Sequence, residues 1–77
     1  MNNHRSFDAR GLFCPMPILK AKENLLKIEI GQVLEVIADD EGAKEDFPAW
    51  CRQTGNELVA VEAEADGSTR FYIRRTA

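Results

Sequence analysis

No part of the sequence has a long apolar run. A helix that crosses a bilayer needs about 18 or more predominantly apolar residues, and no stretch of this chain approaches that length. The residues from Met1 to Arg5 are followed by no apolar segment of the kind that forms a secretory signal. We therefore expect a cytoplasmic protein with no membrane contact.

Cysteine and histidine are scarce. The chain has two cysteines and one histidine, and Cys14 and Cys51 lie far apart, without the short ligand spacing of a metal site. Thiols stay reduced in the cytoplasm, so the two cysteines do not indicate a disulfide. We expect no bound metal and no cofactor.

An excess of positive charge is also missing. The formal net charge is −3 at pH 7, whereas nucleic-acid-binding domains are normally basic, so direct nucleic-acid binding is disfavoured. With 77 residues, 44% of them apolar and 30% charged, the composition predicts one folded domain over residues 1–77, with residues 1–4 disordered. We expect a monomer with one thin core, so any chemistry must lie at an edge or in a shallow groove.

The apolar periodicity predicts the element order strand, helix, strand, helix, strand, strand. The first helix is expected to begin just after Cys14, with Pro15 at its first position and Gly31 after its end. The second helix is expected over residues 43–54, with Gly55 as its cap. The strands are expected at residues 5–9, 32–39, 57–64 and 69–75.

Side-chain spacing predicts which residues form the core. Helical spacing assigns to the buried faces Ile18, Ala21, Leu25 and Leu26 of the first helix and Phe47, Trp50, Cys51 and Thr54 of the second. The second strand is apolar on both faces, as central strands are, with Leu34, Val36 and Ala38 on one face and Val33 and Ile37 on the other. Alternation in the last two strands places on the core side Val59, Val61, Ala63, Phe71 and Ile73.

These elements predict an α+β fold. Asp66 and Gly67 indicate a two-residue hairpin turn between the last two strands. Two amphipathic helices are enough to cover the buried face of a sheet. The expected architecture is a βαβαββ two-layer sandwich, in which a four-stranded mixed sheet has both helices packed on one face. Right-handed crossovers would make the first three strands parallel.

Cys14 is the candidate functional residue, because it falls where the first strand has ended and the first helix begins. Gly11 allows the turn before it. The N-terminus of a helix favours an anion, and the thiolate is the nucleophilic form of cysteine. Pro15 and Pro17 each remove one N–H donor but stiffen the turn. We therefore expect the presentation of the sulfur to matter more than a low pKa.

The surroundings predicted for Cys14 contain no general base. His4, the single histidine, lies in the expected disordered terminus, and the acidic loop at residues 39–41 would raise the thiol pKa. A cysteine without a base suits a group carrier that a partner activates. A buried, structural cysteine is the alternative, and for Cys51, which shares an apolar stripe, core packing is favoured.

The segment from Asp8 to Pro17 resembles the signature of the TusA/SirA-like sulfur carrier family. The hallmark of that family is Cys-Pro-x-Pro at the start of the first helix, and here Cys14, Pro15, Met16 and Pro17 match it. The resemblance extends through the segments 38–40, 50–51, 55–58 and 71–75. It implies the same βαβαββ sandwich, with Gly11 and the two prolines as structural support.

The resemblance also implies a chemical role for Cys14. In the family this cysteine accepts sulfane sulfur from a cysteine desulfurase or a rhodanese-like donor, holds it as a persulfide and passes it to an acceptor protein. For this chain we expect sulfurtransferase-like transfer without independent catalytic turnover. Its pathways include tRNA thiolation, molybdenum cofactor assembly and sulfur oxidation. The tRNA-thiolating member has an acidic residue where this chain has Met16, so the resemblance implies the family and leaves the pathway open.

Three other interpretations remain open at this point. A small sheet with Tyr72, Arg70 and Arg74 on its open face could bind RNA, although Glu35, Glu62 and Glu64 are expected to share that face. Cys14 and Cys51 could form a redox pair if their Cα atoms lay within about 7 Å. The first helix could be part of a protein-interaction module, with Lys20, Lys22 and Lys27 as a docking stripe or as ordinary solvated surface.

Overall fold

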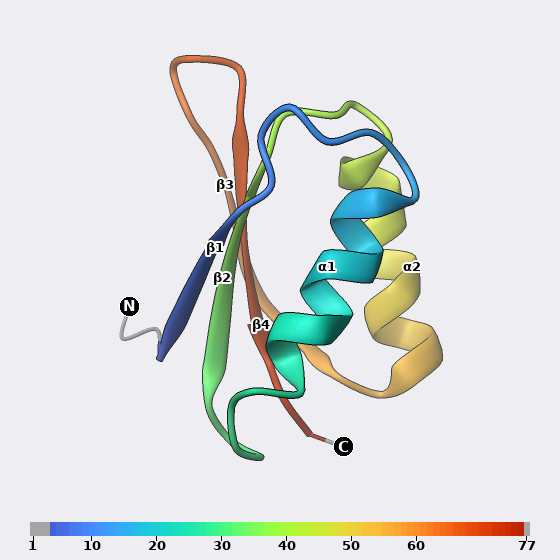
Figure 1. Cartoon of the computed structure of the whole chain (residues 1–77), viewed down its shortest axis with the longest axis vertical. Helices are drawn as coiled ribbons and strands as arrows, with labels where there is room; N and C mark the ends of the chain where they lie inside the picture. The colour runs from blue at the N-terminus through green and yellow to red at the C-terminus, as the bar shows by residue number, and fades with distance from the viewer. Residues whose placement is uncertain (1–3, 77) are drawn as a thin grey trace.

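The computed structural model describes residues 4–76. Its elements follow the predicted order, and Figure 1 shows them as two layers, one of strands and one of helices. The elements are β1 (Arg5–Asp8), α1 (Met16–Leu25), β2 (Val33–Ala38), α2 (Ala43–Thr54), β3 (Glu57–Ala63) and β4 (Thr69–Arg74). Both helices cover the same face of the sheet, which confirms the predicted α+β sandwich.

The sheet has the strand order β1-β2-β4-β3. β1 pairs with β2 in parallel, and β4 pairs antiparallel with both β2 and β3. The first three strands therefore run in the same direction, as predicted. Because β1 and β2 are parallel neighbours, their carboxyl ends meet at one edge of the sheet, and α1 and α2 both run away from that edge (Figure 1).

The core lies between the sheet and the helices. Leu34, Val36 and Ala38 of β2 face the helices and are buried, as their alternation predicts. The rings of Phe47 in α2 and Phe71 in β4 stack with their centroids 4.6 Å apart. These side chains form a single apolar layer, which agrees with the thin core expected of a chain of this length.

The strand β3 differs from its predicted pattern. A register shift follows Leu58, so Leu58 rather than Val59 lies opposite Ile73 and packs against the core. Such a bulge adds one residue to a strand and reverses the alternation of its side chains. Val61 keeps its predicted place opposite Phe71 but is 50% exposed, because β3 is an outer strand.

The hairpin between β3 and β4 is longer than the predicted two-residue turn. The Glu64 N–H donates to the Ser68 carbonyl at 2.9 Å, and the Gly67 N–H donates to the Glu64 carbonyl at 3.2 Å. Gly67 has φ +91°, a conformation that glycine adopts without steric cost. A type of three-residue hairpin loop consists of a turn followed by a glycine in the left-handed conformation, and Gly67 occupies that glycine position here.

The helix boundaries confirm one prediction and correct another. α2 covers the predicted residues, and Gly55 ends it at φ +82° with its N–H donating to the Cys51 carbonyl at 2.9 Å. α1 begins at Met16, one residue later than expected, and Pro15 occupies the position before it. Leu26 lies beyond the end of α1 and is 61% exposed, so its assignment to the core was wrong.

Of residues 1–4, which were predicted to be disordered, residues 1–3 lie outside the described residues and His4 is hydrogen-bonded to β2. The His4 N–H donates to the Val33 carbonyl at 2.8 Å, and the Val33 N–H donates to His4 Nδ1 at 3.1 Å. These two bonds extend the parallel pairing of β1 and β2 by one residue. Between residues 4 and 76, no helix is long and apolar enough to cross a membrane.

The packing of Phe71 predicts a large effect of truncation. Phe71→Ala removes a ring that is 0% exposed and is expected to lower the free energy of unfolding by about 3–5 kcal/mol, measured by urea denaturation. Phe13→Ala is the matched control, because that ring is 75% exposed and its loss should change stability by about 0.5 kcal/mol or less. Equal losses in the two variants would contradict the proposed core.

Candidate functional site

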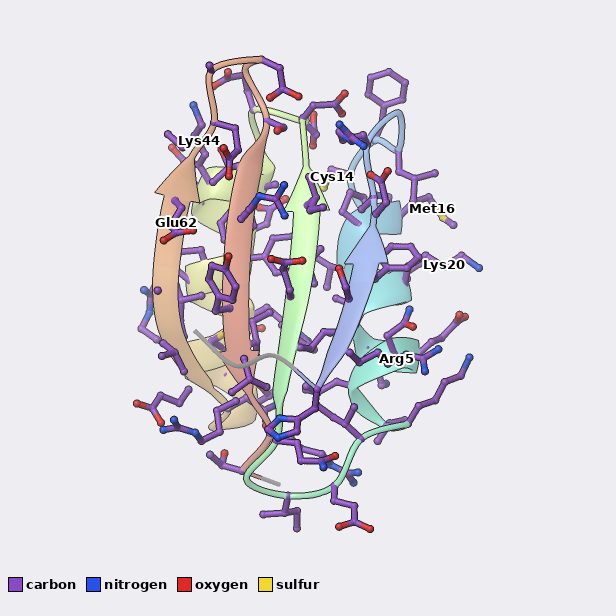
Figure 2. All side chains as sticks on the ribbon, turned by 90° about the vertical axis from the view of Figure 1, so that its left-hand side faces the viewer. Arg5, Cys14, Met16, Lys20, Lys44 and Glu62 are labelled. Carbon is purple, nitrogen blue, oxygen red and sulfur yellow. The ribbon has the colours of Figure 1, made fainter. Side chains whose placement is uncertain are left out.

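Cys14 lies in the loop between β1 and α1, at the edge where β1 and β2 end. Its side chain is exposed, and Figure 2 shows it beside the first turn of α1 at this edge. Gly11, at φ +84°, lets the chain reverse direction after β1, and the Met16 N–H donates to the Phe13 carbonyl at 2.8 Å to close the turn around the cysteine. The predicted presentation of the sulfur at the surface is confirmed.

The acidic loop after β2 holds the backbone of the Cys14 loop. Asp39 Oδ1 accepts a hydrogen bond from the Gly11 N–H at 3.0 Å, and Asp40 Oδ2 accepts one from the Cys14 N–H at 3.3 Å. The expected proximity of this loop to Cys14 is therefore confirmed, and its role is wider than electrostatic. Hydrogen bonds that backbone N–H groups donate to charged carboxylates are stronger than those between neutral groups, so these two bonds fix the position of the cysteine.

Acidic side chains raise the pKa of the Cys14 thiol. The first cause is Asp46, whose carboxylate stabilises the protonated thiol by hydrogen bonding, and desolvation and the charges of Asp46 and Asp40 add to it. Asp46 belongs to α2 and was missed by the sequence analysis. The sequence feature that could have identified Asp46 is its position as an acidic residue in the first turn of a helix that begins at the same sheet edge as Cys14. The thiol is thus presented without being activated.

The single histidine lies at the other end of β1. His4 precedes the amino end of the strand and contacts Val33, whereas Cys14 follows the carboxyl end. The structure therefore places His4 and Cys14 at opposite ends of β1.

Cys51 has no part in the exposed site. It is 3% exposed and packs in the core, and burial raises the pKa of its thiol to about 11. Both cysteines are free thiols. The core position predicted for Cys51 is confirmed, and its burial counts against a redox pair with Cys14.

The proline motif positions the start of α1. Pro15 precedes the helix with no side-chain cap, and Pro17 is buried within the first turn, where helix N–H groups have no intrahelical acceptor. Met16 between them is 39% exposed and points outward beside Cys14 (Figure 2). Phe13, which sequence analysis did not single out, precedes Cys14 and is 75% exposed. Two exposed apolar side chains therefore lie close in sequence to Cys14.

Comparison with known proteins decides the family. The family model described as sulfurtransferase TusA matches residues 5–75. The chain belongs to the TusA family. The sulfur carrier protein TusA of Allochromatium vinosum is 47% identical over 94% of this chain and 93% of that protein. A candidate sulfur carrier of Aquifex aeolicus is 44% identical over 95% of this chain, which spans only 36% of that protein.

The fold is also shared with a solved structure. The crystal structure of a SirA-like protein from Desulfitobacterium hafniense matches with a TM-score of 0.82, over 95% of this chain and 99% of that one. Its sequence identity is 23%, so this likeness shows the TusA-family fold alone.

The three lysines considered for docking do not form one stripe on this TusA-family domain. Lys20 pairs with Glu23 at 3.5 Å, and Figure 2 shows Lys20 pointing outward from α1. Lys22 lies two residues further, about 200° around the helix from Lys20, and lines a groove beside α2. Lys27 lies beyond the end of α1. Of the two interpretations, a stripe rested on sequence proximity, which ignores the helical rotation between neighbouring positions.

The open face of the TusA-family sheet carries an ion-pair network, with Glu62 visible on β3 in Figure 2. Arg70 pairs with Glu35 at 3.2 Å and with Glu64. The Tyr72 hydroxyl donates to Glu62 at 3.1 Å, and Tyr72 is only 7% exposed. The guanidinium and the ring that an RNA ligand would need are therefore already engaged with the protein.

The position of Asp46 predicts how the reactivity of Cys14 changes with charge. Below the pKa of a thiol its alkylation rate follows the thiolate fraction, so removing the carboxylate in Asp46→Asn should speed reaction with iodoacetamide several-fold at about pH 7. The whole curve of rate against pH should move to lower pH. Glu45→Gln removes the same charge one residue away and serves as control. If the two variants shift the curve equally, Asp46 has no specific effect.

Proposed function

We propose that this chain is a sulfur carrier that accepts a sulfane sulfur on Cys14 as a persulfide and passes it to a partner protein. The observation that carries the proposal is that Cys14 is exposed at a structured edge, while Cys51 is buried. Membership of the TusA family supports it, as do relatives named as sulfur carriers. Docking partners are then required, because a carrier must meet both a donor and an acceptor.

The chemistry needs no external oxidant or reductant. The Cys14 thiolate attacks the outer sulfur of a donor persulfide, a new S–S bond forms to Cys14, and the donor S–S bond breaks. The donor cysteine leaves as a thiolate and takes up the proton that Cys14 has lost. In the transfer to the acceptor, Cys14 is the persulfide donor: an acceptor thiolate attacks the outer sulfur, and Cys14 leaves as a thiolate.

The surroundings of Cys14 suit a carrier better than an enzyme. Asp46 and Asp40 raise the thiol pKa, which lowers the fraction of reactive thiolate and so makes the sulfur less prone to oxidation between transfers. Activation is left to the partner, because positive charge brought close to these carboxylates would favour the thiolate. The proposal places the carrier in the cytoplasm, where thiols stay reduced.

Met16 bears on the choice of partner. It is apolar and 39% exposed beside Cys14, so a partner contact at this position is apolar rather than ionic. A partner that needs an acidic side chain between the two prolines would bind this chain less well. Among the three pathway types of the family, this favours a donor or acceptor other than that of the tRNA-thiolating member.

Sulfur loading tests the proposal directly. The protein is incubated with a cysteine desulfurase and cysteine, or with thiosulfate and a rhodanese, and its intact mass is taken under non-reducing conditions. One added sulfur atom is expected in the wild type and in Cys51→Ala, to be removed by a reductant, and none in Cys14→Ser. Alanine is chosen for Cys51 because a serine hydroxyl would be buried without a partner. Equal loading of both variants would falsify the assignment to Cys14.

A further inference from the structure

The helix layer has a groove at the end opposite Cys14. It holds about 230 Å³ and lies between the last turns of α1 and α2, toward which both helices run (Figure 1). We name it the Trp50 groove after its largest lining side chain. Its lining residues are Lys22, Leu25, Leu26, Trp50, Thr54 and Asn56.

The Trp50 groove combines an apolar floor with one cation. Leu25 is buried, Trp50 is half-buried, and Leu26 is 61% exposed at the rim. Lys22 is the charged member of the lining, and over residues 4–76 it makes no ion pair, whereas Lys20 pairs with Glu23. An unpaired ammonium group beside apolar surface complements a ligand with a large apolar side chain and a neighbouring carboxylate.

The groove lies within reach of a protein bound at Cys14. At about 1.5 Å of rise per residue, Lys22 and Leu26 lie roughly 9 and 15 Å along the axis from Met16 at the start of the helix. A standard protein interface covers about 800 Å² on each partner, which spans that distance. A small persulfide molecule at Cys14 cannot contact the groove, so the groove can distinguish protein donors from small ones.

We propose that the protein donor that loads Cys14 places a large apolar side chain, flanked by a carboxylate, in the Trp50 groove while its persulfide meets the sulfur. This inference rests on the proposed carrier function. A donor needs such an anchor because, among the described residues, the Cys14 thiol has no activating base beside it and Asp46 disfavours its thiolate, so productive attack requires that the two sulfur atoms stay close for longer than a collision.

Loading kinetics with matched variants test the groove. The rate of sulfur transfer from a cysteine desulfurase, and separately from a rhodanese, is measured against carrier concentration. Lys22→Glu and Leu26→Ser are each expected to raise the concentration for half-maximal rate about fivefold or more, with the maximal rate unchanged. Lys27→Glu and Ile30→Ser make the same chemical changes at exposed positions outside the groove and should alter it less than about twofold.

Loading by inorganic polysulfide separates this inference from the proposed function. All four variants should load Cys14 at the wild-type rate, because polysulfide needs no docking. Equal kinetics of groove and control variants with the protein donors, or loading by polysulfide but by neither protein, would overturn the groove and leave the carrier function standing. Failure of every donor to load Cys14 would overturn both.

The indole of Trp50 reports occupancy of the groove. The chain has one tryptophan, so its ¹⁵N-labelled form gives a single indole N–H signal. Addition of an inactive donor, whose own reactive cysteine is changed to alanine, should shift or broaden this signal in the wild type and much less in Lys22→Glu. A shift that depends only on the concentration of the carrier would show that a second copy occupies the groove, and would contradict the proposal.

Discussion

The parallel pairing of β1 with β2 is the constraint on which the site depends. It brings the loop that follows each strand to the same edge, where Asp39 and Asp40 accept hydrogen bonds from the backbone of Gly11 and Cys14. The N-terminus of α2 reaches this edge for the same reason and contributes Asp46. One strand register thus sets both the position of the sulfur and the charges around it.

The consequence is a thiol that is accessible and weakly acidic. Accessibility alone would expose a carrier to oxidation, whereas a strongly activated thiolate would react with the first electrophile that it met. Asp40 accepts a hydrogen bond from the Cys14 N–H, and Asp46 and Asp40 raise the pKa of the Cys14 thiol. The acidic side chains at this edge therefore position the sulfur and also lower its reactivity. In the proposed function the partner supplies the activation of the thiol, which suits a domain whose thin core leaves no room for an enclosed active site.

In the proposed mode of docking, the helix layer separates the reactive sulfur from the groove that a partner would contact. Cys14 lies at the end where α1 and α2 begin, and the Trp50 groove lies where they end. Both helices are fixed to the sheet by a common core in which Phe47 stacks on Phe71, so the distance between the two ends is rigid. In the proposed docking, a partner that fits both ends is selected by shape as well as by its reactive group, and the exposed side chains of Phe13 and Met16 are available for apolar contacts near Cys14.

Local patterns in the sequence determined most of the fold. The limits of α2, the left-handed Gly55 after it, the buried face of β2 and the exposure of Cys14 before a proline-rich helix start all follow from periodicity and backbone preferences of neighbouring residues. The tertiary structure alone decided the bulge after Leu58, the effect of Asp46 on the thiol pKa and the separation of Lys22 from Lys20. Each of these depends on which strands pair and how the helices are rotated against one another, and residues distant in sequence set those relations.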